Sequence, residues 1–336
     1  MIQTLPLVLF IVMTELSIGA FTVLVLLDWR HEVTRGFLVS YGLIYLVLTG
    51  LTYLFQQGYS TPELLNTFQR LDKAWTGYET LPLVLFLLLM IPYNILLWLD
   101  KKAGVAGKKP YGGDSQPKES KEEPEQGLSA VRLLRLVVGG LAMVAGLVTL
   151  LVMAMIYRTL ASTTPGEVFT VASFFAGALV LGGVMTAMWL GHWYLVAAEL
   201  SGRPLQFATT LVLLGILLQI IFTVVAGPSI TYANSATSGP TVTATATPAD
   251  TVSAATPAPK SPVKPVGTPT YTPLSTDVIG WLRILVSFVM PLIFGGLAWK
   301  LIRDRSYQSA TGMLYLVVVC TLAGEAIARG LFLMGL

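Results

Sequence analysis

Long apolar runs alternate with short polar breaks along most of the chain. A helix of about 20 residues, rising about 1.5 Å per residue, crosses a hydrocarbon core about 30 Å thick. Eight runs of about this length cover residues 5–27, 36–56, 79–99, 132–157, 168–196, 206–227, 276–300 and 310–334. The pattern therefore predicts an all-α fold, a polytopic membrane helix bundle of about eight transmembrane helices.

Two segments interrupt this pattern. Residues 100–130 are rich in charged side chains, and residues 229–275 consist largely of Thr, Ser, Pro and Ala. Neither segment contains enough apolar surface to offset the entropy cost of ordering, so both are expected to be disordered. They divide the chain into helices one to three (1–99), helices four to six (131–228) and helices seven and eight (276–336).

The composition favours lipid over water as the surrounding medium. Of the 336 residues, 54% are hydrophobic and 12% are charged, whereas soluble domains carry roughly 25% charged residues. The formal net charge is only +3, and six of the ten lysines gather in one loop, residues 100–130. A nucleic-acid partner is therefore not expected.

Three side chains limit thiol and metal chemistry. Cys320 is the single cysteine, and His31 and His192 are the two histidines. This count excludes a disulfide within the chain, a zinc finger and a thiolate-bound iron-sulfur cluster. We expect no covalently bound cofactor, so a redox centre must diffuse in or belong to another subunit.

The lysines and arginines predict the orientation. With the N-terminus outside, 14 of the 21 basic residues fall in inner loops, as the positive-inside rule requires. These residues are Arg30, Arg35, Lys101, Lys102, Lys108, Lys109, Lys118, Lys121, Arg132, Arg135, Arg203, Lys300, Arg303 and Arg305. The prediction is a multi-pass protein of the inner (cytoplasmic) cell membrane, with both termini outside.

Inserting a charged side chain at the centre of a transmembrane helix costs roughly 2.5–3.5 kcal/mol. Each charged side chain within a span is therefore expected to have a structural or functional role. In the predicted topology five of them share the outer leaflet, namely Glu79, Arg158, Arg283, Glu325 and Arg329. Glu325 and Arg329 are four residues apart on one helix face, which predicts a structural ion pair. Glu15, near the middle of the first span, has no evident partner and is interpreted as a protonated or hydrogen-bonded carboxyl.

Carboxylates and guanidiniums in one leaflet suit the head group of a quinone. Oxidation of a quinol releases two protons with two electrons, and a buried glutamate such as Glu79 can accept one of the protons. Arg283 is then expected to contact the head group. The same charges could instead line a path in a transporter or channel, and His31 with His192 could instead ligate a b-type haem.

The chain ends with a Gly-Glu-x-x-x-Arg-x-x-Phe pattern whose last residue is Phe332. Other distinctive segments are Leu5 to Phe10, Gly19 to Leu24, Ala154 to Pro165, Phe174 to Gly183 and Trp281 to Leu285. These segments resemble one family, the membrane-anchor subunit of dimethyl sulfoxide reductase, within a wider set of polysulfide- and nitrite-reductase-type membrane subunits. The closing pattern is the most specific of them.

The resemblance implies eight spans, both termini outside and no bound cofactor. It also implies two partners, an iron-sulfur electron-transfer subunit and a molybdopterin catalytic subunit. Quinone or quinol would be a diffusible substrate, and electrons would pass between the quinone pool and the iron-sulfur subunit. The chain alone would not be an enzyme.

The resemblance also implies a quinol site. The family's glutamate at the start of the third helix matches Glu79, and polar residues of the second outer loop match Asn66 and Arg70. The family's histidine after the second helix falls on Gln56 or Gln57, and this is a departure. Glutamine can hydrogen-bond a quinone oxygen but cannot relay a proton at neutral pH.

Overall fold

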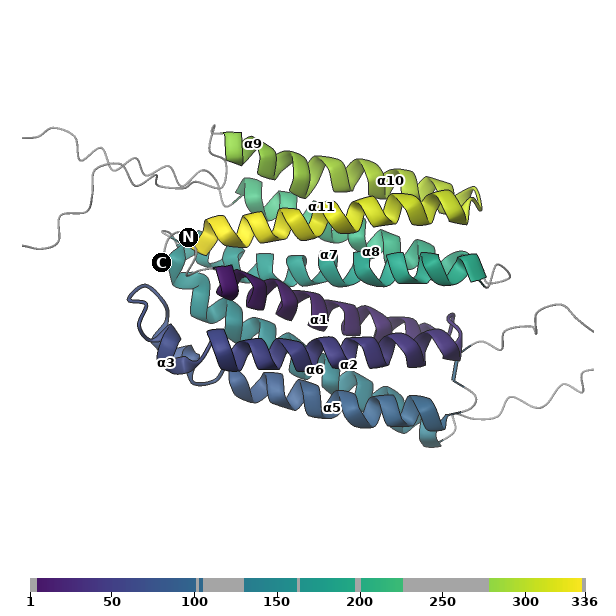
Figure 1. The fold of residues 1–336 in the computed structure, drawn as a ribbon, viewed down its shortest axis with the longest axis horizontal. Coiled ribbons are helices and arrows are strands. Elements are labelled where there is room, and N and C mark those ends of the chain that lie inside the picture. Colours follow the sequence, from purple (N-terminus) through teal and green to yellow (C-terminus); the bar gives the residue numbers. More distant parts are fainter. Residues whose placement is uncertain are drawn as a thin grey trace, which may run out of the picture.

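Eight helices that are long and apolar enough to cross a membrane form a single bundle in the described part of the chain (Figure 1). The computed structural model describes residues 5–100, 103–104, 130–161, 164–196, 201–225 and 278–333. These ranges contain no β-strand, so the predicted all-α bundle is confirmed. The segment 229–275, and nearly all of 100–130, lie outside the described residues.

Each predicted span corresponds to an observed helix within a few residues. Two short helices, α3 and α4, precede the third span, and a π-helical turn interrupts the seventh. The elements are α1 (Leu5–Arg30), α2 (Arg35–Tyr59), α3 (Pro62–Leu65), α4 (Lys73–Thr76), α5 (Thr80–Leu99), α6 (Ala130–Tyr157), η1 (Arg158–Leu160), α7 (Thr164–Val196), α8 (Arg203–Val225), α9 (Val278–Ile284), η2 (Leu285–Val289), α10 (Met290–Arg303) and α11 (Tyr307–Leu333).

Helix α1 is the central element of the bundle. It packs against α2, α6, α7 and α11, and 83% of its most apolar window is buried, against 28–50% for the other seven spans. An apolar helix in a bilayer can face lipid on any side, so apolarity alone does not explain why α1 is enclosed; its enclosure follows from its contacts with these four neighbours. A charged residue in the middle of α1 must therefore find its partner inside the protein.

Small residues let α1 and α7 meet backbone to backbone. A Cβ atom built on Gly182 would lie 1.9 Å from the carbonyl carbon of Gly19, and one on Gly19 would lie 1.8 Å from the carbonyl oxygen of Ala178. No side chain fits in that space. Helices in a bilayer associate through such close contacts, since lipid offers no hydrophobic driving force between them.

Replacing Gly182 with alanine should therefore destabilise the bundle. The added methyl group meets main-chain atoms that cannot move aside, and overpacking of this kind costs about 1–3 kcal/mol. The measurement is reversible unfolding of the purified chain in mixed micelles. Gly50→Ala is the matched control, because nothing lies within 4 Å of its Cβ position, and that variant should be as stable as wild type or slightly more so. Equal stability of the two variants would contradict the close contact.

The seventh span contains a π-helical turn, Leu285–Val289, directly before Pro291. Proline cannot donate a hydrogen bond, so a wider turn is a common way to accommodate it inside a helix. This turn presses Ser287 against α11, where a Cβ on Gly324 would lie 2.7 Å from the Cα of Ser287. In contrast, α5 runs as one α-helix through Pro92.

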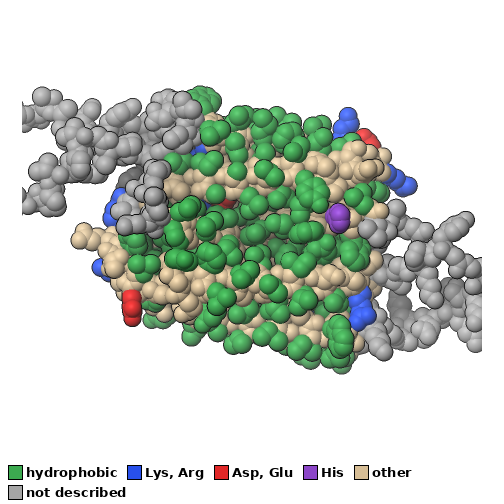
Figure 2. All heavy atoms as spheres, in the orientation of Figure 1, with side chains coloured by type: hydrophobic (Ala, Val, Ile, Leu, Met, Phe, Trp, Pro, Cys, Tyr) green, Lys and Arg blue, Asp and Glu red, His purple; other side chains and the backbone are tan. Residues whose placement is uncertain are grey.

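The surface of the bundle agrees with a lipid environment. Hydrophobic side chains cover its flank, and lysines and arginines appear mainly toward its two ends (Figure 2). Helix α1 begins and α11 ends at the end of the bundle that also carries α3 and the start of α9 (Figure 1). We call this the α3 end. Its assignment to the outer face of the membrane stays a prediction.

Candidate functional site

A buried carboxyl group lies at the α3 end, where α2 ends and α5 begins. Glu79 directly precedes α5 and is 1% exposed. The hydroxyl of Ser60, the residue after α2, donates to the two Glu79 carboxylate oxygens at 3.3 and 3.1 Å. Ser60 is held in place because its own N–H donates to the carbonyl oxygen of Gln56 at 2.9 Å.

Two further polar side chains surround this carboxyl group. The Gln56 amide lies beside Glu79 and is 1% exposed. Tyr157, at the end of α6, is fully buried and lies near both Ser60 and Glu79. Neither the Gln56 amide atoms nor the Tyr157 hydroxyl has a hydrogen-bond partner in good geometry among the described residues. We call Gln56, Ser60, Glu79 and Tyr157 the Glu79 cluster.

The loop that carries α3 and α4 is fastened beside this cluster. The Asp72 N–H donates to the carbonyl oxygen of Ile156 at 3.1 Å, and Arg158 forms an ion pair with Asp72 at 3.0 Å. The Thr159 hydroxyl donates to the carbonyl oxygen of Arg70 at 2.6 Å. The end of α6 therefore fixes the position of the loop that leads into Glu79.

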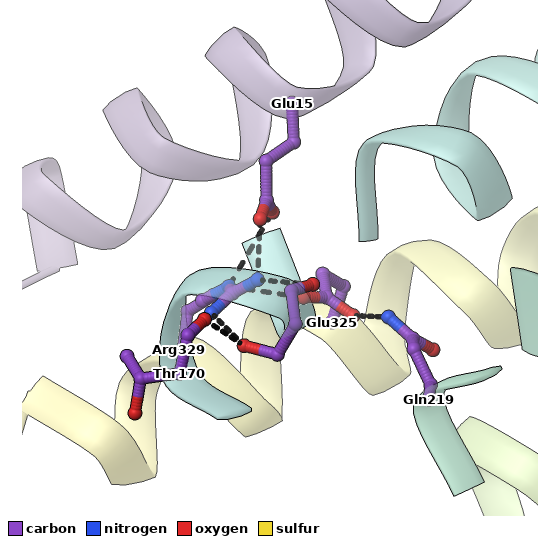
Figure 3. A network of polar contacts seen from close by, with 6 residues as sticks. Glu15, Thr170, Gln219, Glu325 and Arg329 are labelled. Atoms are coloured by element: carbon purple, nitrogen blue, oxygen red, sulfur yellow. Dashed lines mark hydrogen bonds and ion pairs between the residues drawn. The ribbon is translucent and has the colours of Figure 1, made fainter. Parts of the chain in front are cut away.

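A second buried cluster joins four helices (Figure 3). The Arg329 guanidinium donates to both carboxylate oxygens of Glu15 through Nη2 and Nε, and its Nε lies 3.0 Å from Oε1 of Glu325. Gln219 donates from Nε2 to Oε2 of Glu325 at 2.9 Å. Glu15, Glu325 and Arg329 are at most 7% exposed. These residues, together with Ser173, are called the Arg329 cluster.

Helix α7 completes the surroundings of Arg329. The Ser173 hydroxyl accepts from Nη1 of Arg329 at 3.4 Å, and the Ser173 carbonyl oxygen accepts from Nη2 at 3.3 Å. The ring of Phe174 lies 3.9 Å from the guanidinium carbon of Arg329, a cation-π contact. Each nitrogen of the guanidinium thus has at least one acceptor, although the group lies within the membrane-spanning part of the bundle.

An aromatic stack separates the two clusters. The rings of Tyr157 and Phe174 are stacked, with centroids 6.1 Å apart and an interplanar angle of 11°. Tyr157 belongs to the Glu79 cluster, and Phe174 carries Arg329 on its ring. The two clusters are therefore neighbours, each in contact with one member of this stack.

A third charged network lies at the opposite end of the bundle. Arg135 of α6 is fully buried and donates to Asp28 at 2.9 Å and to Asp100 at 2.6 Å. Tyr93 donates its hydroxyl to the second Asp28 oxygen at 3.2 Å. Arg135 was predicted only as a basic residue of an inner loop. Asp28, Asp100 and Arg135 share a position at the inner ends of three predicted spans, and this shared position is the signal in the sequence for the network.

The structure groups the predicted site residues differently from the sequence. Gln56 faces Glu79, but Gln57, Asn66 and Arg70 are exposed, and the Asn66 side chain accepts from the Thr76 hydroxyl at 3.0 Å.

Arg283 is not brought to Glu79. It lies on α9, at the opposite edge of the bundle from α5 (Figure 1). The ion pair between Glu325 and Arg329 is present. Glu15, for which no partner was evident, is paired with Arg329.

The histidines are placed apart from these clusters. His192 is exposed on α7, and His31 lies in the loop between α1 and α2. Desolvation and the nearby Arg132 lower the pKa of His31, so its imidazole is neutral at pH 7. Among the described residues, no group of three His, Cys, Asp or Glu side chains could hold a metal ion.

An eight-helix membrane bundle with charged clusters buried between its helices defines a class of polytopic membrane protein. Comparison with protein families makes the assignment specific. Residues 129–336, more than half of the chain, match the family described as DMSO reductase anchor subunit (DmsC).

The chain belongs to this family, and the predicted resemblance is confirmed. The matched part contains α6 to α11, including Arg329, Glu325 and Gln219, while Glu15 and Glu79 precede it. No curated protein and no solved structure matches the chain.

Proposed function

We propose that the chain holds an iron-sulfur subunit and a molybdopterin catalytic subunit at the inner cell membrane and passes electrons between the quinone pool and the iron-sulfur subunit. Membership of the anchor family supports this role. The apolar flank of the bundle provides the contact with lipid, from which a quinone can enter. The chain contributes the quinone site, and the partners contribute the redox centres.

The Glu79 cluster is the proposed quinone site, with electron flow from quinol to the iron-sulfur subunit. The observation that carries this proposal is a buried carboxyl group beside a buried amide whose polar atoms have no hydrogen-bond partner in good geometry among the described residues. A quinol hydroxyl can donate to the Glu79 carboxylate, while the Gln56 amide donates to the developing quinone oxygen. Oxidation breaks both O–H bonds of the quinol and releases two protons and two electrons. Glu79 takes one proton, the other passes to solvent, and the electrons pass to the iron-sulfur subunit.

Replacing Glu79 with glutamine tests this site. The isosteric amide keeps the shape of the side chain but cannot accept a proton, so quinol oxidation by the assembled complex should fall about tenfold or more. Both the rate of electron transfer and the affinity for a quinol analogue are measured. Glu63→Gln on α3 is the matched control, because Glu63 is exposed, and this variant should behave as wild type.

Unchanged affinity together with unchanged electron transfer in the Glu79→Gln complex would remove Glu79 from the mechanism. A transporter makes a different prediction. It would move a substrate across vesicles that contain this chain alone, without partner subunits.

A further inference from the structure

Among the described residues, four tyrosine side chains are fully buried, and three of them have a hydrogen-bond partner for their hydroxyl. The pairs are Tyr45 with Thr186 at 2.9 Å, Tyr93 with Asp28 at 3.2 Å and Tyr194 with the carbonyl oxygen of Ser201. The fourth is Tyr157, whose hydroxyl has no partner in good geometry in the described part of the chain. A buried tyrosine hydroxyl normally finds a partner, so this one points to a group that the chain does not supply.

The position of Tyr157 is fixed by its ring and by its main chain. The ring is stacked on that of Phe174, with centroids 6.1 Å apart. The preceding residue, Ile156, accepts at its carbonyl oxygen from the N–H of Asp72 at 3.1 Å, which fastens the end of α6 to the loop before α5. The Tyr157 hydroxyl is therefore held within the Glu79 cluster.

The hydrogen of this hydroxyl is available to a ligand. The Ser60 hydroxyl lies beside it, but the geometry between the two groups is not that of a good hydrogen bond. Ser60 has a single hydrogen, which it donates to the two Glu79 carboxylate oxygens at 3.3 and 3.1 Å. The Gln56 amide also has no partner in good geometry among the described residues. Two donors, Tyr157 and Gln56, thus lie beside one carboxyl group in a buried site.

Two donors beside a carboxylate match the oxygen of a quinone better than the hydroxyl of a quinol. The quinol hydroxyl gives its hydrogen bond to Glu79 and is itself a neutral acceptor. As its proton leaves, the oxygen gains negative charge, and hydrogen bonds to a charged acceptor are roughly twice as strong as those to a neutral one. The quinone oxygen that results has no hydrogen and can accept from both donors.

We propose that Tyr157 determines how tightly the site binds the oxidised form relative to the reduced form, by donating its hydroxyl to the quinone oxygen whose proton Glu79 has taken. This inference rests on the proposed function. Both O–H bonds of the quinol break: one proton forms an O–H bond on Glu79, the other passes to solvent, and the two electrons pass to the iron-sulfur subunit. The O–H bond of Tyr157 itself stays intact.

Binding of a short-chain naphthoquinone to the full chain in lipid vesicles tests this proposal. Without partner subunits no electron acceptor is present, so the oxidised and reduced forms can be titrated separately without oxygen. Tyr157→Phe removes only the hydroxyl and keeps the ring. Its affinity for the quinone should fall about tenfold, while its affinity for the quinol should stay within about twofold of wild type. The midpoint potential of the bound couple should then rise by about 30 mV, because weaker binding of the oxidised form favours reduction.

Tyr45→Phe is the matched control. It also removes a buried tyrosine hydroxyl, but one that is paired with Thr186 and lies outside the Glu79 cluster. Both affinities of this variant should equal those of wild type. Retained quinol binding in Tyr157→Phe shows at the same time that the altered site is still folded.

Two results would overturn the role of Tyr157. One is a loss of quinol affinity in Tyr157→Phe as large as the loss of quinone affinity, because a hydroxyl that only shapes the site does not distinguish the two forms. The other is unchanged affinity for both forms. Glu79→Gln in the same assay separates this inference from the proposed function. If Glu79→Gln weakens quinol binding and Tyr157→Phe changes nothing, only the role of Tyr157 is wrong; if neither variant changes binding, the proposed quinone site is wrong as well.

Discussion

Replacing Arg329 with leucine should destabilise the folded chain by about 3–5 kcal/mol, because it leaves two buried carboxyl groups without their cation. Glu15 and Glu325 both contact this guanidinium, and both are buried in the bundle. The loss of the cation-π contact with Phe174 adds to the cost. The measurement is the free energy of unfolding in mixed micelles.

The matched control is Arg303→Leu, which removes an exposed arginine at the end of α10. Its effect should stay within about 0.5 kcal/mol. Adding Glu15→Gln and Glu325→Gln to the Arg329→Leu chain should restore much of the lost stability, since no charge is then left unpaired. If the triple variant were no more stable than Arg329→Leu alone, packing rather than charge would explain the loss.

The second large effect is expected at the opposite end of the bundle. Arg135→Leu should also cost about 3–5 kcal/mol, because Asp28 and Asp100 lose the guanidinium that joins α1, α5 and α6. Lys300→Leu, at an exposed position of α10, is the control and should be nearly neutral. Unfolding is followed as for Arg329.

A double variant separates charge from packing at this network. Asp28→Asn in the Arg135→Leu background should cost less than the sum of the two single changes, because each removes the partner of the other. Strictly additive effects would show that Arg135 and Asp28 do not interact energetically, whatever their distance of 2.9 Å.

Length and hydropathy were sufficient to predict the helices, since the thickness of a bilayer fixes how long an apolar run must be. The spacing of Glu325 and Arg329 likewise predicted their ion pair, because residues four apart share a helix face. Both predictions depend on local sequence alone.

Packing between helices could not be predicted in the same way. Glu15 and Arg329 are 314 positions apart, and nothing in either segment shows that α1 and α11 are neighbours. Arg283 illustrates the opposite error: a shared leaflet fixes depth in the membrane but not position around the bundle, so it was grouped with Glu79 although the two lie at opposite edges.

The environment of a charge at the end of a span was also not predictable. Arg135 was counted among the basic residues of the inner loops, whereas the folded chain buries it together with Asp28 and Asp100. Long side chains near a helix end can turn either toward the interface or toward a neighbouring helix, and only the packing decides between these directions.

The contact between Gly19 and Gly182 has a mechanical consequence. Two helices whose main chains touch cannot slide or rotate past each other without steric overlap, so α1 and α7 behave as one stiff unit. Glu15 belongs to one of these helices and Phe174 to the other. A movement that opens the bundle to a large molecule is therefore expected in the peripheral helices. The main chains of α1 and α7, and with them the positions that carry Glu15 and Phe174, are expected to keep their relative placement.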